Sequence, residues 1–125
     1  MRVSGATFVV ASLRNRIVGI GHVLPARERD GDGAVIPGLA HLSMVAVEPE
    51  YWGKGLGKAI VRHFLARAKQ SGFDTMQLWT HLTNERAQGL YGGIGFREAG
   101  RDKVDERGEL IRLYRMQLDR LDGPQ

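Results

Sequence analysis

The feature that most constrains the fold is an apolar strand that runs directly into a turn with three alternating glycines. Residues 41–47 (HLSMVAV) are nearly all apolar after their first positions, which is typical of a strand covered on both faces. Gly53, Gly55 and Gly57 follow, and apolar side chains then recur at helical spacing. Glycine lets backbone N–H groups come close to a ligand, and the amino end of the helix adds positive potential. The segment therefore predicts an anion site for a phosphate or pyrophosphate.

Two common nucleotide-binding motifs do not fit this turn. A Walker loop requires a glycine where Trp52 stands and a hydroxyl side chain where Ala59 stands. A dinucleotide fingerprint requires its third glycine at Lys58 or at Ile60. Lys54 adds a further positive charge beside Lys58. An anion remains the predicted ligand, and a glycine-rich turn without a ligand remains the alternative.

Composition places the chain among ordinary globular proteins. It has 125 residues, of which 42% are hydrophobic and 26% charged, so we expect one domain over residues 1–125 with a frayed tail at 119–125. The absence of cysteine excludes disulfides, a cysteine nucleophile and a thiolate zinc site. No apolar run is long enough to span a bilayer or to act as a signal peptide, so a cytoplasmic protein without a membrane partner is predicted.

The net charge of +4 is spread along the chain and is not interleaved with clustered aromatic residues. We therefore expect no nucleic-acid partner.

Periodicity and turn residues predict a mixed α/β fold in the order β-β-β-α-β-α-β-β. Gly72 ends the first predicted helix, which begins near Leu56, and Asn84 or Thr83 caps the second. Charges, glycines and prolines predict a long loop at 25–38 and a turn at 101–108. The acidic groups of the long loop are either solvated or placed to attract a cationic amine. Strands are predicted at residues 7–12, 17–24, 41–47, 75–80, 96–100 and 109–118.

A second motif, N-x-x-A-x-x-[LF]-Y-x-x-x-G-F, lies downstream. It is matched by Asn84, Ala87, Leu90, Tyr91, Gly95 and Phe96. Taken together with the glycine turn, this motif makes the sequence resemble the GNAT superfamily of acetyl-CoA-dependent N-acetyltransferases over residues 7–118. The superfamily's pattern for the turn is [QR]-x-x-G-x-[GA], and the turn here reads W-G-K-G-L-G. Trp52 departs from the Gln or Arg of the first pattern.

The resemblance implies a mostly antiparallel central sheet, with acetyl-CoA between two splayed strands as the acetyl donor and an amine as the acceptor. Tyr91 would lie by the thioester sulfur. The backbone near the end of the first splayed strand would pair with the pantetheine arm, the glycine turn would hold the pyrophosphate, and Asn84 would bond the pantetheine. The implied cofactor-binding residues are Val45, Ala46, Val47, Gly53, Lys54, Gly55, Leu56, Gly57, Lys58 and Asn84.

The family usually carries a strand and two helices before the first hairpin, and only residues 1–6 precede Thr7 here. Three readings stay open: an unusually open acceptor site, a site completed by another chain, or the C-terminal part of a longer protein. The late strands of this family commonly pair in dimers, so a homodimer is a further expectation.

Acetyl transfer requires removal of a proton from the amine, donors for the tetrahedral oxyanion and an acid for the thiolate. Tyr91 suits the acid role because a phenol with pKa near ~10 can donate to a thiolate of similar basicity, although a packing role is the alternative. By resemblance, His41 stands where the histone-acetylating branch of the family has a glutamate base. Other branches have a glutamate base at the position of Trp79, and a tryptophan cannot act as a base. Imidazole suits a base at neutral pH, but a structural histidine is equally open. His81 and Glu48 are weaker candidates.

No metal site is predicted, because none of the four histidines stands at ligand spacing from another. The predicted function is transfer of an acetyl group from acetyl-CoA to a primary amine of a small molecule or peptide, by direct attack in a ternary complex. The alternative is a noncatalytic module that binds acyl-CoA.

Overall fold

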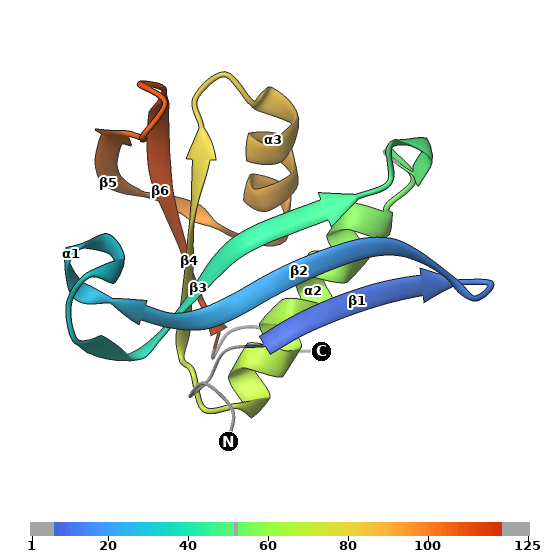
Figure 1. Cartoon of the computed structure of the whole chain (residues 1–125), viewed down its shortest axis with the longest axis horizontal. Helices are drawn as coiled ribbons and strands as arrows, with labels where there is room; N and C mark the ends of the chain where they lie inside the picture. Colours follow the sequence, from blue (N-terminus) through green and yellow to red (C-terminus); the bar gives the residue numbers. More distant parts are fainter. Residues whose placement is uncertain (1–6, 52, 119–125) are drawn as a thin grey trace.

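The computed structural model describes residues 7–51 and 53–118, and the predicted frayed tail at 119–125 lies outside them. Six strands form one sheet in the order β1-β2-β3-β4-β6-β5, with helices α2 and α3 packed on it (Figure 1). The predicted mixed α/β fold is confirmed. The elements are β1 Thr7–Leu13, β2 Arg16–Arg27, α1 Glu28–Gly31, β3 Val35–Val47, the 3-10 turn η1 Pro49–Tyr51, α2 Leu56–Gln70, β4 Thr75–His81, α3 Glu85–Ile94, β5 Arg97–Val104 and β6 Leu110–Gln117.

All neighbouring strands are antiparallel except β3 and β4, which pair in parallel only through residues 39–41 and 75–77. Beyond His41 and Gln77 the two strands part, as Figure 1 shows. A bulge accompanies the separation: His22 pairs with Met44 and Val23 with Leu42, so Ser43 is an extra residue in β3. We call the opening between residues 42–47 of β3 and residues 78–81 of β4 the fork.

The core lies between the sheet and helix α2. The helical periodicity of the sequence is confirmed, since the buried residues of α2 are Ile60, Val61, Phe64, Leu65 and Ala68. Met76 and Leu78 of β4 belong to the same buried cluster, and residues of α3 pack against it. Side chains alternate along a strand, so residues 77, 79 and 81 of β4 face away from the helices.

The predicted long loop at 25–38 is wrong. Strand β2 continues to Arg27 and β3 begins at Val35, so only the α1 turn and residues 32–34 connect them. Pro25 pairs with Ala40 next to a register shift, a position where the sheet tolerates the missing proline N–H. Long-range pairing therefore outweighs the local turn signal of the prolines and glycines.

The predicted turn at 101–108 is also too long, because β5 extends to Val104. The charged residues that suggested a turn pair across the hairpin instead. The Nε and Nη2 atoms of Arg112 donate to the two carboxylate oxygens of Asp102 over 2.8 and 3.0 Å. The predicted helix ends are confirmed: the Asn84 side chain accepts a hydrogen bond from Ala87 N at 3.0 Å, and Gly72 adopts a φ of 99° just after α2. In the described part of the chain, every helix is too short or too polar to cross a membrane.

Replacing Gly21 by alanine should destabilise the fold. Phe64 is fully buried, and its ring occupies the space that a Cβ at Gly21 would take. Overpacking of this kind costs roughly 1–3 kcal/mol of unfolding free energy. Urea unfolding monitored by circular dichroism measures the change. The matched control is Gly92→Ala on the exposed surface of α3, where a Cβ meets open space and helix propensity favours alanine by up to about 1 kcal/mol. Equal stability of Gly21→Ala and the unmodified protein would contradict this packing.

Candidate active site

A cavity of about 840 Å³ lies between the end of β3, the glycine turn and helix α3. It collects segments that are far apart in the sequence. Lys54, Leu56 and His41 are the predicted site residues that do not line it. The lining residues are Val45, Ala46, Val47, Gly53, Gly55, Gly57, Lys58, Asn84, Arg86, Ala87, Leu90 and Tyr91.

The end of β3 forms one wall of this cavity because, at residues 45–47, the strand pairs with β2 along one edge and no longer pairs with β4 along the other. Val45, Ala46 and Val47 are in register with Gly21, Ile20 and Gly19 of β2, whereas β4 has already left β3 after His41. The backbone of this arm thus borders the fork, where an extended ligand can run alongside a strand.

The glycine turn has the geometry expected of an anion cradle. Gly53 and Gly55 adopt left-handed backbone with φ of 78° and 81°, a conformation that disfavours side chains. A Cβ at either position would meet open space, so there is room for a ligand. Gly55 caps α2 without a side-chain hydrogen bond, and the first turn of α2 contains no acidic residue. The first N–H groups of the helix and the Lys58 ammonium therefore favour a negatively charged group.

Two predicted residues of the turn, Lys54 and Leu56, do not line the cavity. Lys54 is exposed, with its Nζ 6.0 Å from the centre of the Tyr51 ring. Leu56 starts α2 and packs against the core instead of facing the cavity. Trp52 lies outside the described residues.

Helix α3 supplies the opposite wall. Tyr91 packs edge-on against Phe96, with ring centres 5.6 Å apart, and burial raises the pKa of its phenol. The phenol is therefore neutral at physiological pH and able to donate a proton. Arg86 also lines the cavity and is a further cation that neither sequence motif indicates. Arg86 occupies a variable position of the second motif. Only its helical spacing, one turn before Leu90, could have indicated that it shares the helix face that lines the cavity.

His41 lies at the base of the fork, in the last parallel pair with Gln77. The guanidinium of Arg115 donates to Gln77 Oε1 over 3.4 Å. This contact orients the Gln77 amide so that its Nε2 atom faces His41 Nδ1, and the distance between these two nitrogens is 3.4 Å. Nδ1 of the neutral ring then accepts and Nε2 carries the proton. Burial, helped by the charge of Lys103 and opposed by that of Asp30, lowers the pKa of His41. The base role of His41 requires the other tautomer and stays a prediction from the sequence.

The outer side of the fork, away from the helices, carries a charged strap. Asp30 of the α1 turn forms ion pairs with Arg101 at 3.0 Å and Lys103 at 3.2 Å. The two cations stack over Trp79, 5.2 and 4.5 Å from its ring centre. The strap therefore joins the connection between β2 and β3 to strand β5.

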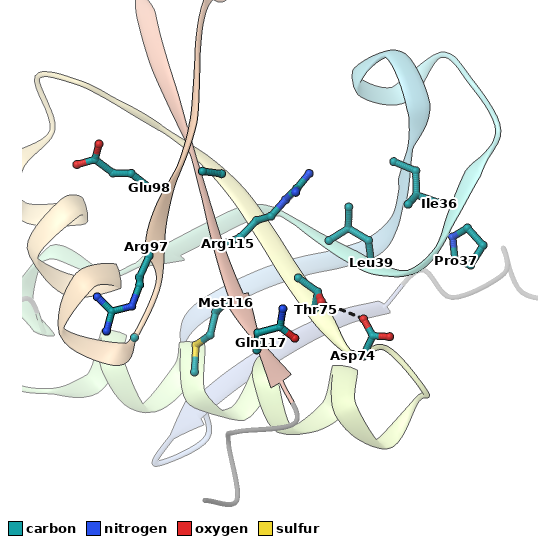
Figure 2. A pocket seen from close by; sticks show the side chains of 12 residues that line it. Ile36, Pro37, Leu39, Asp74, Thr75, Arg97, Glu98, Arg115, Met116 and Gln117 are labelled. Carbon is teal, nitrogen blue, oxygen red and sulfur yellow. Dashed lines mark hydrogen bonds between the residues drawn. The ribbon is translucent and has the colours of Figure 1, made fainter.

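A second cavity of about 720 Å³ lies at the opposite end of β4, where the strand begins (Figure 2). Leu39, Thr75, Arg115 and Gln117 are among its lining residues, and Thr75 Oγ1 donates to Asp74 Oδ1 over 2.9 Å. None of the residues predicted for catalysis or cofactor binding lines this cavity.

The sequence matches the Acetyltransferase (GNAT) family over residues 2–96. The chain belongs to this family. It is 29% identical over 112 residues to N-acetyltransferase 8F1 of Rattus norvegicus, which covers 90% of this chain and 49% of that protein. It is 31% identical over 100 residues to N-acetylaspartate synthetase of Danio rerio, covering 80% and 33%. The [Ribosomal protein bS18]-alanine N-acetyltransferase of Escherichia coli is 37% identical over 60 residues, covering 48% and 40%. The chain thus spans half or less of the length of these relatives.

Solved structures confirm the GNAT fold. The ribosomal-protein-S18-alanine N-acetyltransferase of Escherichia coli superposes with a TM-score of 0.73 at 20% identity, covering 94% of this chain and 72% of that one. A GNAT family acetyltransferase of Elizabethkingia anophelis with acetyl-CoA bound gives 0.72 at 16% identity, covering 91% and 77%. Spermidine N-acetyltransferase of Vibrio cholerae gives 0.78 at 17% identity, covering 96% and 70%.

The lowered pKa of His41 predicts a pH dependence of stability. The folded protein favours the neutral ring, so this contribution is present above the ordinary value of about 6.5 and is lost as the pH falls through the lower folded pKa. Urea unfolding at several pH values should show a shallower acid decline in His41→Gln than in the unmodified protein. His63→Gln, on the exposed face of α2, is the control and should keep the original decline. Identical acid slopes in all three proteins would contradict the burial of neutral His41.

Proposed function

We propose that this chain transfers the acetyl group of acetyl-CoA to a primary amine. One observation carries the proposal: a single cavity brings together the backbone arm of β3, the glycine cradle and the Tyr91 phenol. The three parts match an extended thiol arm, a pyrophosphate and a thiolate leaving group.

The chain's residues fit acetyl-CoA as a bound donor. Residues 45–47 border the fork and would pair their backbone with the pantetheine arm. The cradle from Gly53 to Gly57 has open space for the pyrophosphate, and Lys58 lies on the cavity wall to balance its charge. Arg86 adds a second cation on the facing helix. Asn84, which caps α3 through its Oδ1 atom, would bond the pantetheine. Lys54 and Leu56 would contribute through the backbone of the turn.

Bound acetyl-CoA supplies the acetyl group and a thiolate leaving group. Tyr91 would protonate that thiolate as the carbon–sulfur bond breaks, and burial keeps its phenol in the acidic form. Backbone N–H groups of the β3 arm would face the developing oxyanion. The amine would attack directly, in a ternary complex, from the side of the fork that the helices leave uncovered.

The acceptor is a small molecule or a peptide with a primary amine. Relatives named for N-acetylaspartate, for a ribosomal protein alanine and for spermidine suggest aspartate, an N-terminal alanine peptide and a polyamine as first candidates. His41 as base, a cytoplasmic location and a homodimer remain predictions. The competing proposal is a noncatalytic acyl-CoA-binding module, which would show ligand binding without turnover.

Acetyl-CoA should stabilise the protein against heat. A ligand at about one hundred times its dissociation constant adds roughly 2.7 kcal/mol of stability, which a thermal-shift titration detects. ATP and NAD are the comparison ligands, because the turn fits neither the Walker loop nor the dinucleotide fingerprint. An equal rise of the unfolding temperature with ATP and NAD would contradict the assignment of acetyl-CoA. No rise with any of the three ligands would mean that the glycine turn of this chain does not bind them.

Tyr91→Phe should lower kcat by about 100-fold or more, the range of a positioned acid, while the dissociation constant of acetyl-CoA stays unchanged. The phenyl ring preserves the packing against Phe96, so the loss isolates the hydroxyl. Release of free thiol measures turnover, and isothermal titration calorimetry measures binding. Unchanged turnover would show that Tyr91 only packs against the donor.

A further inference from the structure

His81, at the carboxyl end of β4, makes side-chain contact with two carboxylates. Its Nε2 atom lies 3.0 Å from Asp105 Oδ2 and 3.1 Å from Glu109 Oε1. The Asp105 side chain is 15% exposed, and its Oδ1 atom accepts hydrogen bonds from the backbone N–H groups of Arg107 and Glu109, both at 2.9 Å. Asp105 is thus fixed by the turn between β5 and β6 and presents its other oxygen to the imidazole.

The backbone of His81 is equally well held. Its carbonyl accepts hydrogen bonds from Asn84 N and from Gln88 Nε2, both at 3.0 Å. Gln88 also donates to the carbonyl of Leu82 at 2.8 Å. The turn that leads from β4 into α3 therefore fixes the position of the imidazole from the other side.

This geometry determines which nitrogen of His81 carries the proton. A carboxylate only accepts hydrogen bonds, so the neutral ring donates Nε2–H to Asp105 and Glu109. Nδ1 then carries the lone pair. Within the part of the chain that the structure describes, Nδ1 of His81 makes no hydrogen bond, and the side chain is 43% exposed. His81 offers an accessible lone pair, whereas the Nδ1 atom of His41 is occupied by Gln77.

His81 also lies on the open side of the fork. It is four residues beyond Gln77, the last residue of β4 paired with β3, and Val45 is four residues beyond His41 on the other arm. Both arms therefore extend about 13 Å from the base of the fork at these positions. The helices and the cavity occupy one side of the sheet, and His81 shares the other side with Trp79 and Gln77. Under the proposed function, an amine that enters from the uncovered side would approach on the face that carries this imidazole.

We propose that His81 Nδ1 is the base that takes the proton from the acceptor amine, with Asp105 and Glu109 as positioning residues. The inference rests on the proposed function. As the amine nitrogen bonds to the acetyl carbon, one N–H bond breaks and its proton moves to Nδ1, directly or through one water. The two carboxylates then face the imidazolium, as the orienting carboxylate does in other base–carboxylate pairs. The carbon–sulfur bond breaks and the thiolate takes the proton of Tyr91.

The test compares His81→Gln with His63→Gln, the same substitution on the exposed face of α2. Aspartate, an N-terminal alanine peptide and spermidine serve as acceptors, and thiol release is followed from pH 5 to 9, a range of about four units that spans imidazole titration. His81→Gln should lower kcat by about 100-fold or more and change the shape of the kcat/KM profile with pH, leaving the rise that comes from deprotonation of the acceptor amine. The dissociation constant of acetyl-CoA should not change. Added imidazole should partly restore turnover in His81→Ala.

Asp105→Asn tests the positioning role. Its Oδ1 atom can still accept the two backbone hydrogen bonds of the turn, but its amide would donate to Nε2 and move the ring proton toward Nδ1. We expect a lower kcat with unchanged thermal stability and acetyl-CoA affinity. The charged groups that face His81 are Asp105 and Glu109, so Glu109→Gln should reduce kcat in the same direction.

Each outcome supports or overturns the inference. An unchanged pH profile and full turnover in His81→Gln would overturn this assignment and leave the proposed function intact. Absence of turnover in the unmodified protein with every acceptor would overturn both. One side-chain nitrogen or oxygen atom of each of the three residues lies within 4.8 Å of those of the other two. Activity that is abolished by EDTA and restored by Zn²⁺ would therefore show a metal-dependent site and overturn the base role.

Discussion

The parallel ladder between β3 and β4 extends through only three residues on each strand, and the bulge at Ser43 accompanies its end. Beyond this ladder β3 and β4 no longer pair with each other, so backbone groups that face the fork can bond to water or to an extended ligand. Such a ligand would lie along an arm as an added strand does. The fork is therefore a break in the pairing of the sheet, and its β3 arm lines the cavity that we propose for acetyl-CoA.

Gly57 links this break to the helices. A Cβ placed on it would lie 3.7 Å from Leu90 of α3 and 4.0 Å from Val47 of β3. The amino end of α2, the β3 arm and α3 thus converge around one small residue. The cradle is fixed by the same contacts that fix the core, because α2 carries buried residues from Ile60 to Ala68 along its length. The proposed anion binding and the folding of the chain consequently depend on one packing arrangement.

The sequence predicted those parts whose signal is local. The strand, the glycine turn and the periodic helix are contiguous, and the Asn84 cap depends on a residue only three positions away. Residues 25–38 were predicted wrongly because the pairing of Arg27 with Val35 is a tertiary effect that outweighs local turn propensity. The cluster around His81 was not predicted, since Asp105 lies 24 residues away and only the strand register brings it near. Arg86 was missed because one cation on a helix carries no signal of its own.

The strap of Asp30, Arg101 and Lys103 over Trp79 has a consequence for how such a protein can diverge. The cavity side of the fork includes Gly53 and Gly55, whose left-handed backbone disfavours any other residue. The opposite side is built from side chains on two hairpin connections, and those connections accept substitution and insertion readily. Mutation can therefore remodel that side of the fork while the glycine turn stays constant, and under the proposed function new acceptors could be acquired without rebuilding the proposed acetyl-CoA site.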